Sequence, residues 1–562
     1  LGSRNTAIGT FSLDAQNFTG ATNSNNTAVG YSSGSGVSTG IDNTLLGARA
    51  GMVLSDADYN VAVGMGALTA DTKGSRSTAI GRSALAAQNF SSATNSNNTA
   101  VGYNAGVAVT TGISNSFLGA YSGDATTDGD YNVAIGTEAL TTNTLGHRSV
   151  AVGVSALKTQ NYDSGTNAYN VAVGYGAGEA ITTGTQNVIV GGLAGDAITT
   201  GLINVLVGTN AGSGLTEGLE NVAMGHNTLL VDTKGQRSTA LGYGTLAYQN
   251  FTSLTEVYNT AVGFNAGSAV TTGIQNTLIG GLAGDALTDA DFNVAIGKGA
   301  LSADTQGSQS TAVGVGALES QNFSSATDAR NTAVGLNAGN AVTTGTNNIL
   351  IGVSSGASGA GNLTDQNDNI IIGNDGGQNA SSTRNIAIGQ ESNINGHNDA
   401  IVIGYNVDSV GNSHFTFGKD DGANRVYNSY TANASWSRIS DERYKKDITD
   451  NTDCGLDFIN ELRPVTFKFK APSELDSNLP DYDASNDKAT YENKMYGLIA
   501  QEVKSAMATH NITDFGGHDE IEGSGIQAIS QEMFVHPLIK AVQELSAKND
   551  ALEARIKTLE GG

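Results

Sequence analysis

A short unit, Asn or Ser, any residue, Ala, Leu or Ile, then Val, Ile or Leu, and a closing Gly, recurs 23 times between residues 5 and 404. This repeat restricts the possible folds more than any other feature. The closing glycines of successive units are separated by 21, 17, 17 and 17 residues, which gives a larger period of 72 residues. One interval, from Gly153 to Gly242, measures 89 residues, which is one period plus a further 17-residue unit. A second marker, Gln-Asn followed by an aromatic residue, keeps the same spacing, and its aromatic residues are Phe18, Phe90, Tyr162, Phe251 and Phe323. A period this regular indicates a repeat protein.

Each unit predicts a very short strand, because a few alternating apolar residues are bounded by Asn and Gly. The segments between units are rich in Gly and Asn, which supply the positive φ that tight corners need. We therefore predict a mainly β protein, with a β-solenoid or β-roll shaft over residues 1–405. Strands about 4.8 Å apart would give 23 rungs a length of roughly 100 Å. Such a thin coil buries little and leaves an apolar outer face, so we expect a homotrimeric shaft.

The composition excludes several classes of protein. The chain has 74 Gly, 4 Pro, 39% hydrophobic residues and a net charge of −25, so it is too apolar for a disordered chain. The negative charge disfavours a nucleic-acid partner and repels anionic lipid. Cys454 is the only cysteine, and no apolar run approaches the roughly 18 residues of a membrane helix. We expect no cofactor, no metal site and no membrane insertion, and we interpret the start at Leu1, without a Met, as part of a longer protein.

Three recurring features of the shaft are candidate sites. The aromatic residues of the second marker could stack on sugars, although a role in covering a seam between subunits is the simpler interpretation. Paired aspartates could bind Ca²⁺ but more simply cap turns; they are Asp56 and Asp58, Asp128 and Asp130, and Asp289 and Asp291. A basic position is replaced by Gln309 in the last full repeat, which favours salt links between chains over catalysis; its members are Arg4, Arg76, Arg148 and Arg237.

The character of the chain changes after residue 405. We predict an irregular β connector over residues 406–439 and a small α+β domain over residues 440–562. The chain ends in a heptad pattern that predicts a coiled coil at about residues 535–560. Its d positions are Leu538, Leu545, Leu552 and Leu559, and its a positions are Val542, Asn549 and Ile556. Asn549 would fix the register, and salt links around the seam would involve Glu544, Lys548, Glu553 and Lys557. A helix packed on its own domain is the alternative.

The shaft pattern, for example Asn98 to Gly106, resembles the head repeats of trimeric autotransporter adhesins, and similar repeats occur in phage tail fibres. This resemblance implies a trimeric left-handed β-roll. The rungs of 17 and 21 residues are longer than the usual unit of those heads.

Four ordered blocks of the terminal domain resemble the intramolecular chaperone of endosialidase-type phage tail spikes and fibres. The blocks are residues 440–448, 456–464, 496–503 and 536–545, with the sequences SDERYKKDI, LDFINELRP, YGLIAQEV and HPLIKAVQEL. The resemblance implies a trimeric domain that nucleates the fibre fold and then cuts itself off before its serine. Carried over to this chain, the scissile bond is Ile439–Ser440, with Ser440 as nucleophile and Lys445 as its base.

The implied chemistry places a condition on the geometry. A serine hydroxyl is a poor nucleophile until a base accepts its proton, and a lysine is a base only when burial or nearby positive charge lowers its pKa. Arg443 and Lys446 could supply that charge. Five residues apart, Ser440 and Lys445 point to opposite faces of a strand, so they can meet only across a turn or between chains.

We therefore interpret the chain as a phage tail fibre that is located in the virion and matures by a single self-cleavage with a Ser-Lys dyad, with no activity on free substrates. Its expected partners are two further copies, other tail proteins bound through a preceding segment, and a host receptor or glycan. The alternative is a bacterial trimeric surface adhesin without enzymatic activity, which would need a C-terminal membrane barrel where this chain has a heptad helix. A carbohydrate-degrading spike would need an acidic cleft, for which the sequence gives no sign.

Overall fold

The computed structural model describes residues 2–356, 363–377, 381–420, 424–430, 437–488, 494–521 and 525–561. The chain divides into two compact units, residues 1–440 and residues 441–562, which are described separately.

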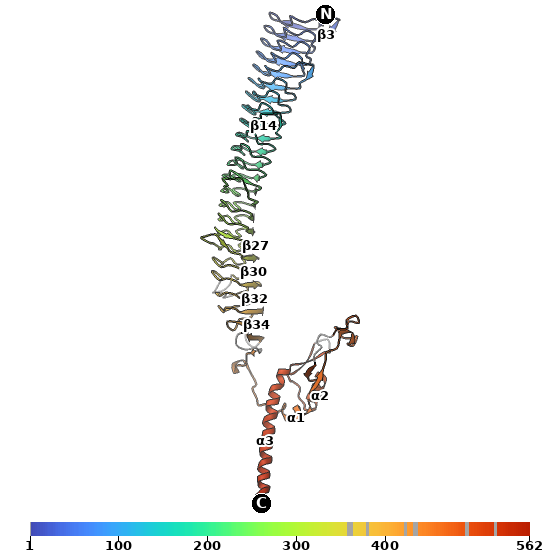
Figure 1. The fold of residues 1–562 in the computed structure, drawn as a ribbon, viewed down its shortest axis with the longest axis vertical. Coiled ribbons are helices and arrows are strands. Elements are labelled where there is room, and N and C mark those ends of the chain that lie inside the picture. Colours follow the sequence, from blue (N-terminus) through green and yellow to red (C-terminus); the bar gives the residue numbers. More distant parts are fainter. Residues whose placement is uncertain are drawn as a thin grey trace. The chain divides into compact units, whose positions relative to one another are not determined.

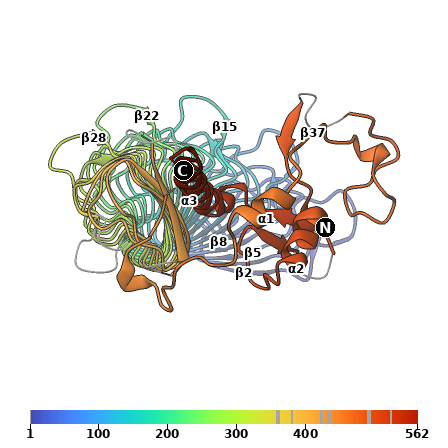
Figure 2. The ribbon, with the colours of Figure 1, turned by 90° about the horizontal axis from the view of Figure 1, so that it is seen from below.

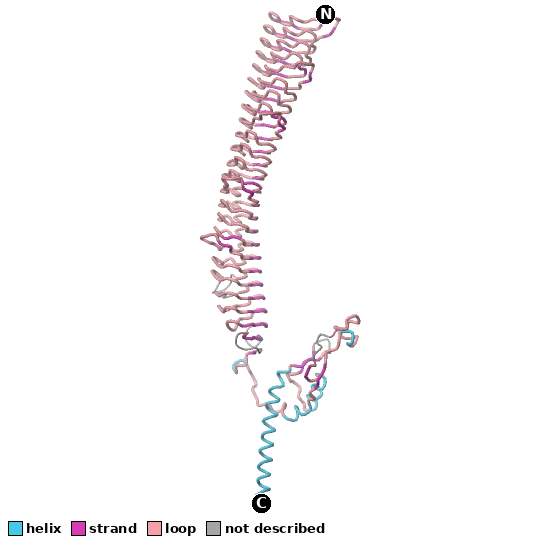
Figure 3. Tube along the Cα trace, viewed as in Figure 1, coloured by secondary structure: helices cyan, strands magenta, loops and turns pink. Residues whose placement is uncertain are grey.

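The first unit is a β-solenoid in which 24 strands form one continuous parallel ladder (Figure 1). Most rungs contribute a strand of three residues, and the rest of the rung is loop (Figure 3). At about 4.8 Å per rung, the ladder is roughly 110 Å long. The strands are β2 (Thr6–Ile8), β4 (Thr27–Val29), β5 (Thr44–Leu46), β6 (Val61–Val63), β8 (Thr78–Ile80), β10 (Thr99–Val101), β11 (Ser116–Leu118), β12 (Val133–Ile135), β14 (Val150–Val152), β16 (Val171–Val173), β17 (Val188–Val190), β18 (Val205–Val207), β19 (Val222–Met224), β21 (Thr239–Leu241), β23 (Thr260–Val262), β24 (Thr277–Ile279), β25 (Val294–Ile296), β27 (Thr311–Val313), β29 (Thr332–Val334), β30 (Ile349–Ile351), β31 (Ile370–Ile372), β32 (Ile386–Ile388), β33 (Ile401–Tyr405) and β34 (His414–Lys419).

The long rungs carry a second, two-residue parallel pair. Loops at these pairs project from the stack near the labels β15, β22 and β28 in Figure 2. The pairs are β1 (Gly2–Ser3) with β3 (Thr22–Asn23), β7 (Gly74–Ser75) with β9 (Thr94–Asn95), β13 (Gly146–His147) with β15 (Thr166–Asn167), β20 (Gly235–Gln236) with β22 (Thr255–Glu256), and β26 (Gly307–Ser308) with β28 (Thr327–Asp328). The four additional residues of a long rung thus form an additional corner.

The ladder continues one rung beyond the recognisable repeat. β34 pairs in parallel with β33, and Thr416 takes the inward position while Gly418 closes the rung. After it, β35 (Arg425–Ser429) and β36 (Ser437–Arg438) run antiparallel, which ends the parallel ladder. The irregular strands expected after residue 405 therefore include one more solenoid rung.

The core of the shaft is a line of inward side chains with complementary sizes. The middle residue of each strand points inward and is fully buried, as at Ala134 and Phe117. Where the middle residue is large, the position four residues after the closing glycine of the same rung is also a glycine. On the rung of Phe117 this position is Gly123, and a Cβ there would lie 2.6 Å from the Phe117 ring. Where the middle residue is Ala134, the same corner is Leu140, which is also fully buried. One rung therefore accommodates only one bulky residue at these two positions.

The closing glycine is required for the rungs to stack. At Gly191 the φ angle is +141°, and a Cβ would lie 2.3 Å from the carbonyl oxygen of Gly208 on the next rung. No side chain fits this contact without separating the rungs, which explains why the glycine recurs in every unit.

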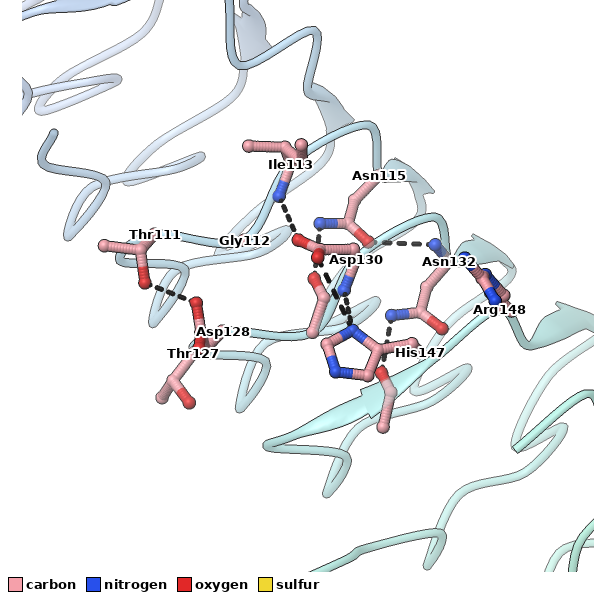
Figure 4. A network of polar contacts seen from close by, with 12 residues as sticks. Thr111, Gly112, Ile113, Asn115, Thr127, Asp128, Asp130, Asn132, His147 and Arg148 are labelled. Atoms are coloured by element: carbon pink, nitrogen blue, oxygen red, sulfur yellow. Dashed lines mark hydrogen bonds and ion pairs between the residues drawn. The ribbon is translucent and has the colours of Figure 1, made fainter. Parts of the chain in front are cut away.

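The asparagine of each unit forms a buried ladder of side-chain hydrogen bonds. In Figure 4 the Asn132 backbone amide donates to the Asn115 Oδ1 at 2.9 Å, and the Asn132 Nδ2 donates to the Gly146 carbonyl at 2.8 Å. Each such asparagine satisfies one donor and one acceptor of the backbone that would otherwise be buried unpaired. Because one ladder residue bonds the next rung, the ladder also fixes the register of the rungs.

The second unit is a small α/β domain. It contains α1 (Leu456–Glu461), α2 (Ala500–Thr509) and the long α3 (Val535–Glu560), with the antiparallel pairs β37 (Val465–Phe467) with β38 (Met495–Gly497) and β39 (His518–Glu520) with β40 (Gln527–Ile529). Short 3-10 helices cover Glu442–Tyr444, Pro472–Glu474 and Gln531–Phe534. Its core centres on the fully buried Phe458, which packs edge-to-face against Phe515. The predicted fold class, a solenoid followed by a small mixed domain that ends in a helix, is confirmed.

Candidate functional site

Ser440 is the last residue of the first unit, and it follows directly on β36 and Ile439. Residues 439–441 have no regular secondary structure. Ile439 is half-buried and Ser440 is exposed, so the peptide bond between them lies in an accessible stretch of chain.

A 3-10 turn separates Ser440 from Lys445. The turn is Glu442–Tyr444, Asp441 caps its start, and the Lys445 amide donates to the Glu442 carbonyl at 3.0 Å. The sequence required a turn or a second chain between the two residues, and the structure contains the turn. The contact between the Ser440 hydroxyl and the Lys445 amine remains a prediction.

Arg443 forms a bidentate ion pair with Asp441 across the same turn. Its Nη2 lies 2.6 Å from Asp441 Oδ2, and its Nε donates to Oδ1 at 3.0 Å. These bonds lower the pKa of Asp441. The pair offsets the charge of Arg443, so this arginine is not an uncompensated positive charge beside Lys445.

The segment after Ser440 is exposed. Every residue from 441 to 450 is exposed, including the apolar Tyr444 and Ile448. A lysine acts as a base near neutral pH only when it is buried or has positive neighbours, and this exposed segment does not bury Lys445.

Helix α3 uses two different faces. Pro537 and Ala541 are buried, and these residues face the domain's own α1, while Leu545, Leu552 and the other heptad leucines are more than half exposed. The two interpretations of the sequence thus apply to different faces of one helix. Packing on its own domain occupies one face, and the a/d stripe remains uncovered in the single chain.

Glu544 has a role that the sequence did not reveal. Its Oε2 accepts the backbone amide of Leu456 at 2.8 Å, at the start of α1, and a Cβ on Gly455 would lie 2.6 Å from this carboxylate. Lys540 lies 3.6 Å away, one turn earlier. Glu544 was expected to form salt links around the seam; instead it anchors α3 to α1 within its own domain.

An apolar groove runs along the domain toward the heptad stripe. Two neighbouring cavities of about 420 and 290 Å³ share Pro464, Leu498 and Phe534 as lining residues. Leu538, the first d position of the heptads, lines the second cavity. Groove and stripe are therefore continuous.

The aromatic residues of the long rungs are not exposed, which corrects both sequence interpretations. Phe18, at the start of the shaft, is half-buried. The other four, Phe90, Tyr162, Phe251 and Phe323, are 5–7% exposed and lie inside their own chain. A Cβ on Gly74 would lie 2.7 Å from the Phe90 ring, so the ring lies directly over the glycine of β7. They fill the additional corner and are available neither to sugars nor to a subunit seam.

The paired aspartates bond neighbouring rungs. Asp130 accepts the Ile113 amide at 2.8 Å, and Asp128 accepts the Thr111 hydroxyl at 2.5 Å (Figure 4). These bonds join residues 17 positions apart on neighbouring rungs, whereas the sequence predicted that the aspartates cap their own turns. The arginine column likewise has partners within the chain: Arg148 donates to the Tyr169 hydroxyl at 2.8 Å, and Arg237 donates to Glu220 Oε2 at 2.8 Å. The sequence predicted that these arginines form salt links between chains.

Three buried carboxylates, Asp71, Asp232 and Asp304, lie at equivalent corners of the shaft repeat. Asp232 accepts the Gln249 side-chain amide at 2.6 Å and two backbone amides at 3.1 Å. Desolvation nevertheless raises the pKa of all three, because burial outweighs these bonds. At the equivalent corner the chain has Asn143, which makes similar bonds.

We expect the combined Asp71→Asn, Asp232→Asn and Asp304→Asn variant to unfold at a higher temperature than the wild type at pH 7. A folded-state pKa above the unfolded value near 3.8 means that ionisation destabilises the folded shaft. The difference should shrink as the pH falls below the raised folded-state pKa, and it should vanish below the unfolded value, where both states hold the proton. Calorimetry at one scan rate between pH 4 and 8 measures it. A variant that is less stable than the wild type at pH 7 would contradict this account.

No helix among the described residues is long and apolar enough to cross a membrane. In the same part of the chain, no group of three or more His, Cys, Asp or Glu side chains is placed to bind a metal ion.

Residues 440–512 match the peptidase family described as chaperone of endosialidase. The match begins at Ser440 and includes the 3-10 turn, α1 and α2. The chain thus carries a C-terminal chaperone domain of the endosialidase type after a β-solenoid shaft, and this family implies a self-cleaving peptidase domain. No curated protein and no solved structure matches the chain.

Proposed function

We propose that this protein is a phage tail fibre whose C-terminal domain assembles three chains and is then released by cleavage of the Ile439–Ser440 bond. The solenoid serves as the shaft that reaches the host surface. The observation that carries the proposal is the uncovered heptad stripe of α3, with Leu545 55% and Leu559 76% exposed, in a domain of a chaperone family.

Association covers what the single chain leaves exposed. The stripe of α3 continues into the groove at Phe534 and Leu538, and apolar residues before the closing glycines, such as Ile296 and Ile351, remain exposed along the shaft. Exposed apolar surface on this scale indicates contact with other chains. In the proposed assembly, three parallel chains related by one three-fold axis cover the stripe, the groove and these residues of the shaft.

The proposed cleavage uses groups of this chain only. The Ser440 Oγ attacks the carbonyl carbon of Ile439 while Lys445 Nζ accepts the hydroxyl proton. The C–N bond breaks, an ester between Ile439 and Oγ forms, and the lysine returns the proton to the freed Ser440 amine. One water then hydrolyses the ester, which leaves a carboxylate at Ile439 and restores the serine hydroxyl.

Assembly is the step that completes this site. Lys445 is exposed in the single chain, and in the assembled protein a neighbouring copy supplies the burial that a lysine needs to act as a base. Cleavage before assembly would remove the chaperone too early. Coupling the two events prevents that loss.

The test is the double variant Leu545→Asp and Leu552→Asp, which charges the stripe while leaving the buried face of α3 intact. We expect it to keep the helical circular dichroism of the terminal domain but to remain monomeric and uncut. The matched control, Gln543→Asp with Ala551→Asp, alters exposed positions off the stripe and should assemble and be cut as the wild type. A stripe variant that still forms trimers would contradict the proposed role of α3.

A further inference from the structure

Three aromatic side chains on successive rungs form a stack on the surface of the shaft. They are His226, Tyr243 and Phe264, each directly after a closing glycine, on the rungs of β19, β21 and β23. The ring centroids are 5.3 and 5.5 Å apart, with interplanar angles of 4° and 14°. These distances are close to the rung spacing, so the rings stack along the shaft, just before β27 in Figure 1.

The stack ends at a glycine that the fold does not require. On the next rung, the position after the closing glycine is Gly281, and a Cβ there would have no neighbour closer than the Phe264 carbonyl oxygen at 4.0 Å. Its φ lies outside the left-handed region, whereas the closing glycines combine positive φ with backbone contacts below 3 Å. A glycine lowers stability relative to alanine, so its presence at this open position lacks a structural reason.

Gly281 leaves one face of Phe264 open. Tyr243 covers the opposite face of the ring, and Phe264 is 56% exposed. The residue that follows the closing glycine of the next rung is Lys298. It is exposed, and it forms no ion pair among the described residues. Phe264 and Lys298 are two rungs apart, roughly 10 Å along the ladder. We call the position between them, which Gly281 leaves without a side chain, the slot.

We propose that this slot binds one pyranose ring of a host polysaccharide. The apolar face of a pyranose stacks on an aromatic ring, as other apolar groups do, and its hydroxyl or carboxylate oxygens accept hydrogen bonds from the lysine ammonium. The stacked Tyr243 and His226 hold the Phe264 ring in place before the sugar arrives. The proposal names the ligand class for the host contact of the proposed fibre, and it rests on that function.

The chain supplies a matched comparison. The sequence GGLAGDA occurs twice, at residues 191–197 and 280–286, and Gly192 is as open as Gly281, with no atom within 4 Å of a Cβ. The residues on either side of Gly192 in its column are Tyr175 and Thr209, so this copy lacks the lysine and the aromatic stack. Leucine at either glycine should be tolerated by the fold, but only Gly281→Leu fills the proposed slot.

The experiment uses the mature wild-type fibre on an array of oligosaccharides built from neutral hexoses and from hexuronic acids, followed by calorimetric titration with the best-bound oligosaccharide. Phe264→Ala and Gly281→Leu should weaken binding about 3- to 10-fold per site, and Gly192→Leu should not. Lys298→Met should weaken uronate binding more than neutral binding if the ligand is acidic, and both equally if it is neutral.

Two results would overturn the inference. One is a trimeric, correctly cut fibre that binds none of the oligosaccharides, which would leave the proposed assembly and cleavage intact. The other is loss of the trimer in Gly281→Leu but not in Gly192→Leu, which would identify the slot as a contact between subunits.

Discussion

A chain with Ser440→Ala is expected to remain whole, whereas the wild type separates into a shaft that ends at Ile439 and a fragment that begins with Ser440. Alanine lacks the hydroxyl that attacks the Ile439 carbonyl, so the effect is complete loss of the fragment rather than a slower reaction. Because Ser440 is exposed, the substitution should leave the fold unchanged. Denaturing gels and terminal sequencing measure the products, and trimer formation should persist.

A lysine elsewhere in the domain provides the control for the base. Lys445→Ala should also prevent cleavage, because no other group is proposed to take the hydroxyl proton, whereas Lys488→Ala, at an exposed position, should be cut at close to the wild-type rate. Ser505→Ala, at an exposed position of α2, controls for the loss of a hydroxyl elsewhere in the domain. Efficient cleavage of Lys445→Ala would remove the lysine from the proposed mechanism while the serine result stood on its own.

Phe117→Ala is expected to have the largest effect on the shaft itself. Phe117 is 1% exposed and is among the largest fully buried side chains. Truncating a buried phenylalanine costs about 3–5 kcal/mol, because the lost contacts are joined by a cavity. Both adjacent corners are glycines, Gly106 and Gly123, so no nearby side chain can fill the space. A lower temperature of shaft unfolding in calorimetry would report this loss.

The double variant Phe117→Ala with Gly123→Leu tests the size rule directly. It recreates the pairing of Ala134 with Leu140 on the next rung, where leucine occupies the same corner with φ +57°. We expect the double variant to be more stable than Phe117→Ala, and Gly123→Leu alone to be less stable than the wild type because its side chain would overlap the Phe117 ring. Additive effects of the two substitutions would contradict the rule.

The solenoid could be predicted from the sequence because the closing glycine has a steric role that no other residue can take. The last rung, β34, escaped the prediction since its Phe415-Thr-Phe-Gly418 lacks the asparagine of the unit, although the closing glycine was visible. The backbone at the corners was not predictable. Tyr131 adopts φ +58°, and the hydrogen bond from its amide to the Ile113 carbonyl at 3.0 Å, on the preceding rung, helps to hold it there.

The terminal domain shows a different limit. The heptad stripe could be identified because it is local, but the bond between Glu544 and Leu456 joins residues 88 positions apart and leaves no local pattern. For the same reason the sequence could not tell that Phe90 lies over Gly74 inside the rung and not on the surface. The spacing of the repeat and of the heptads could be recognised in the sequence, whereas the partners of individual side chains, such as Phe90 over Gly74, could not.

The central claim is that the terminal domain assembles three chains and is then cut away. Native mass spectrometry of purified wild-type protein tests it most directly. The account predicts a complex of three shafts, each of residues 1–439, together with a separate fragment of residues 440–562. A shaft expressed alone as residues 1–439 should fail to form that complex. A cut shaft that is monomeric, or shafts that form trimers without the domain, would contradict the account.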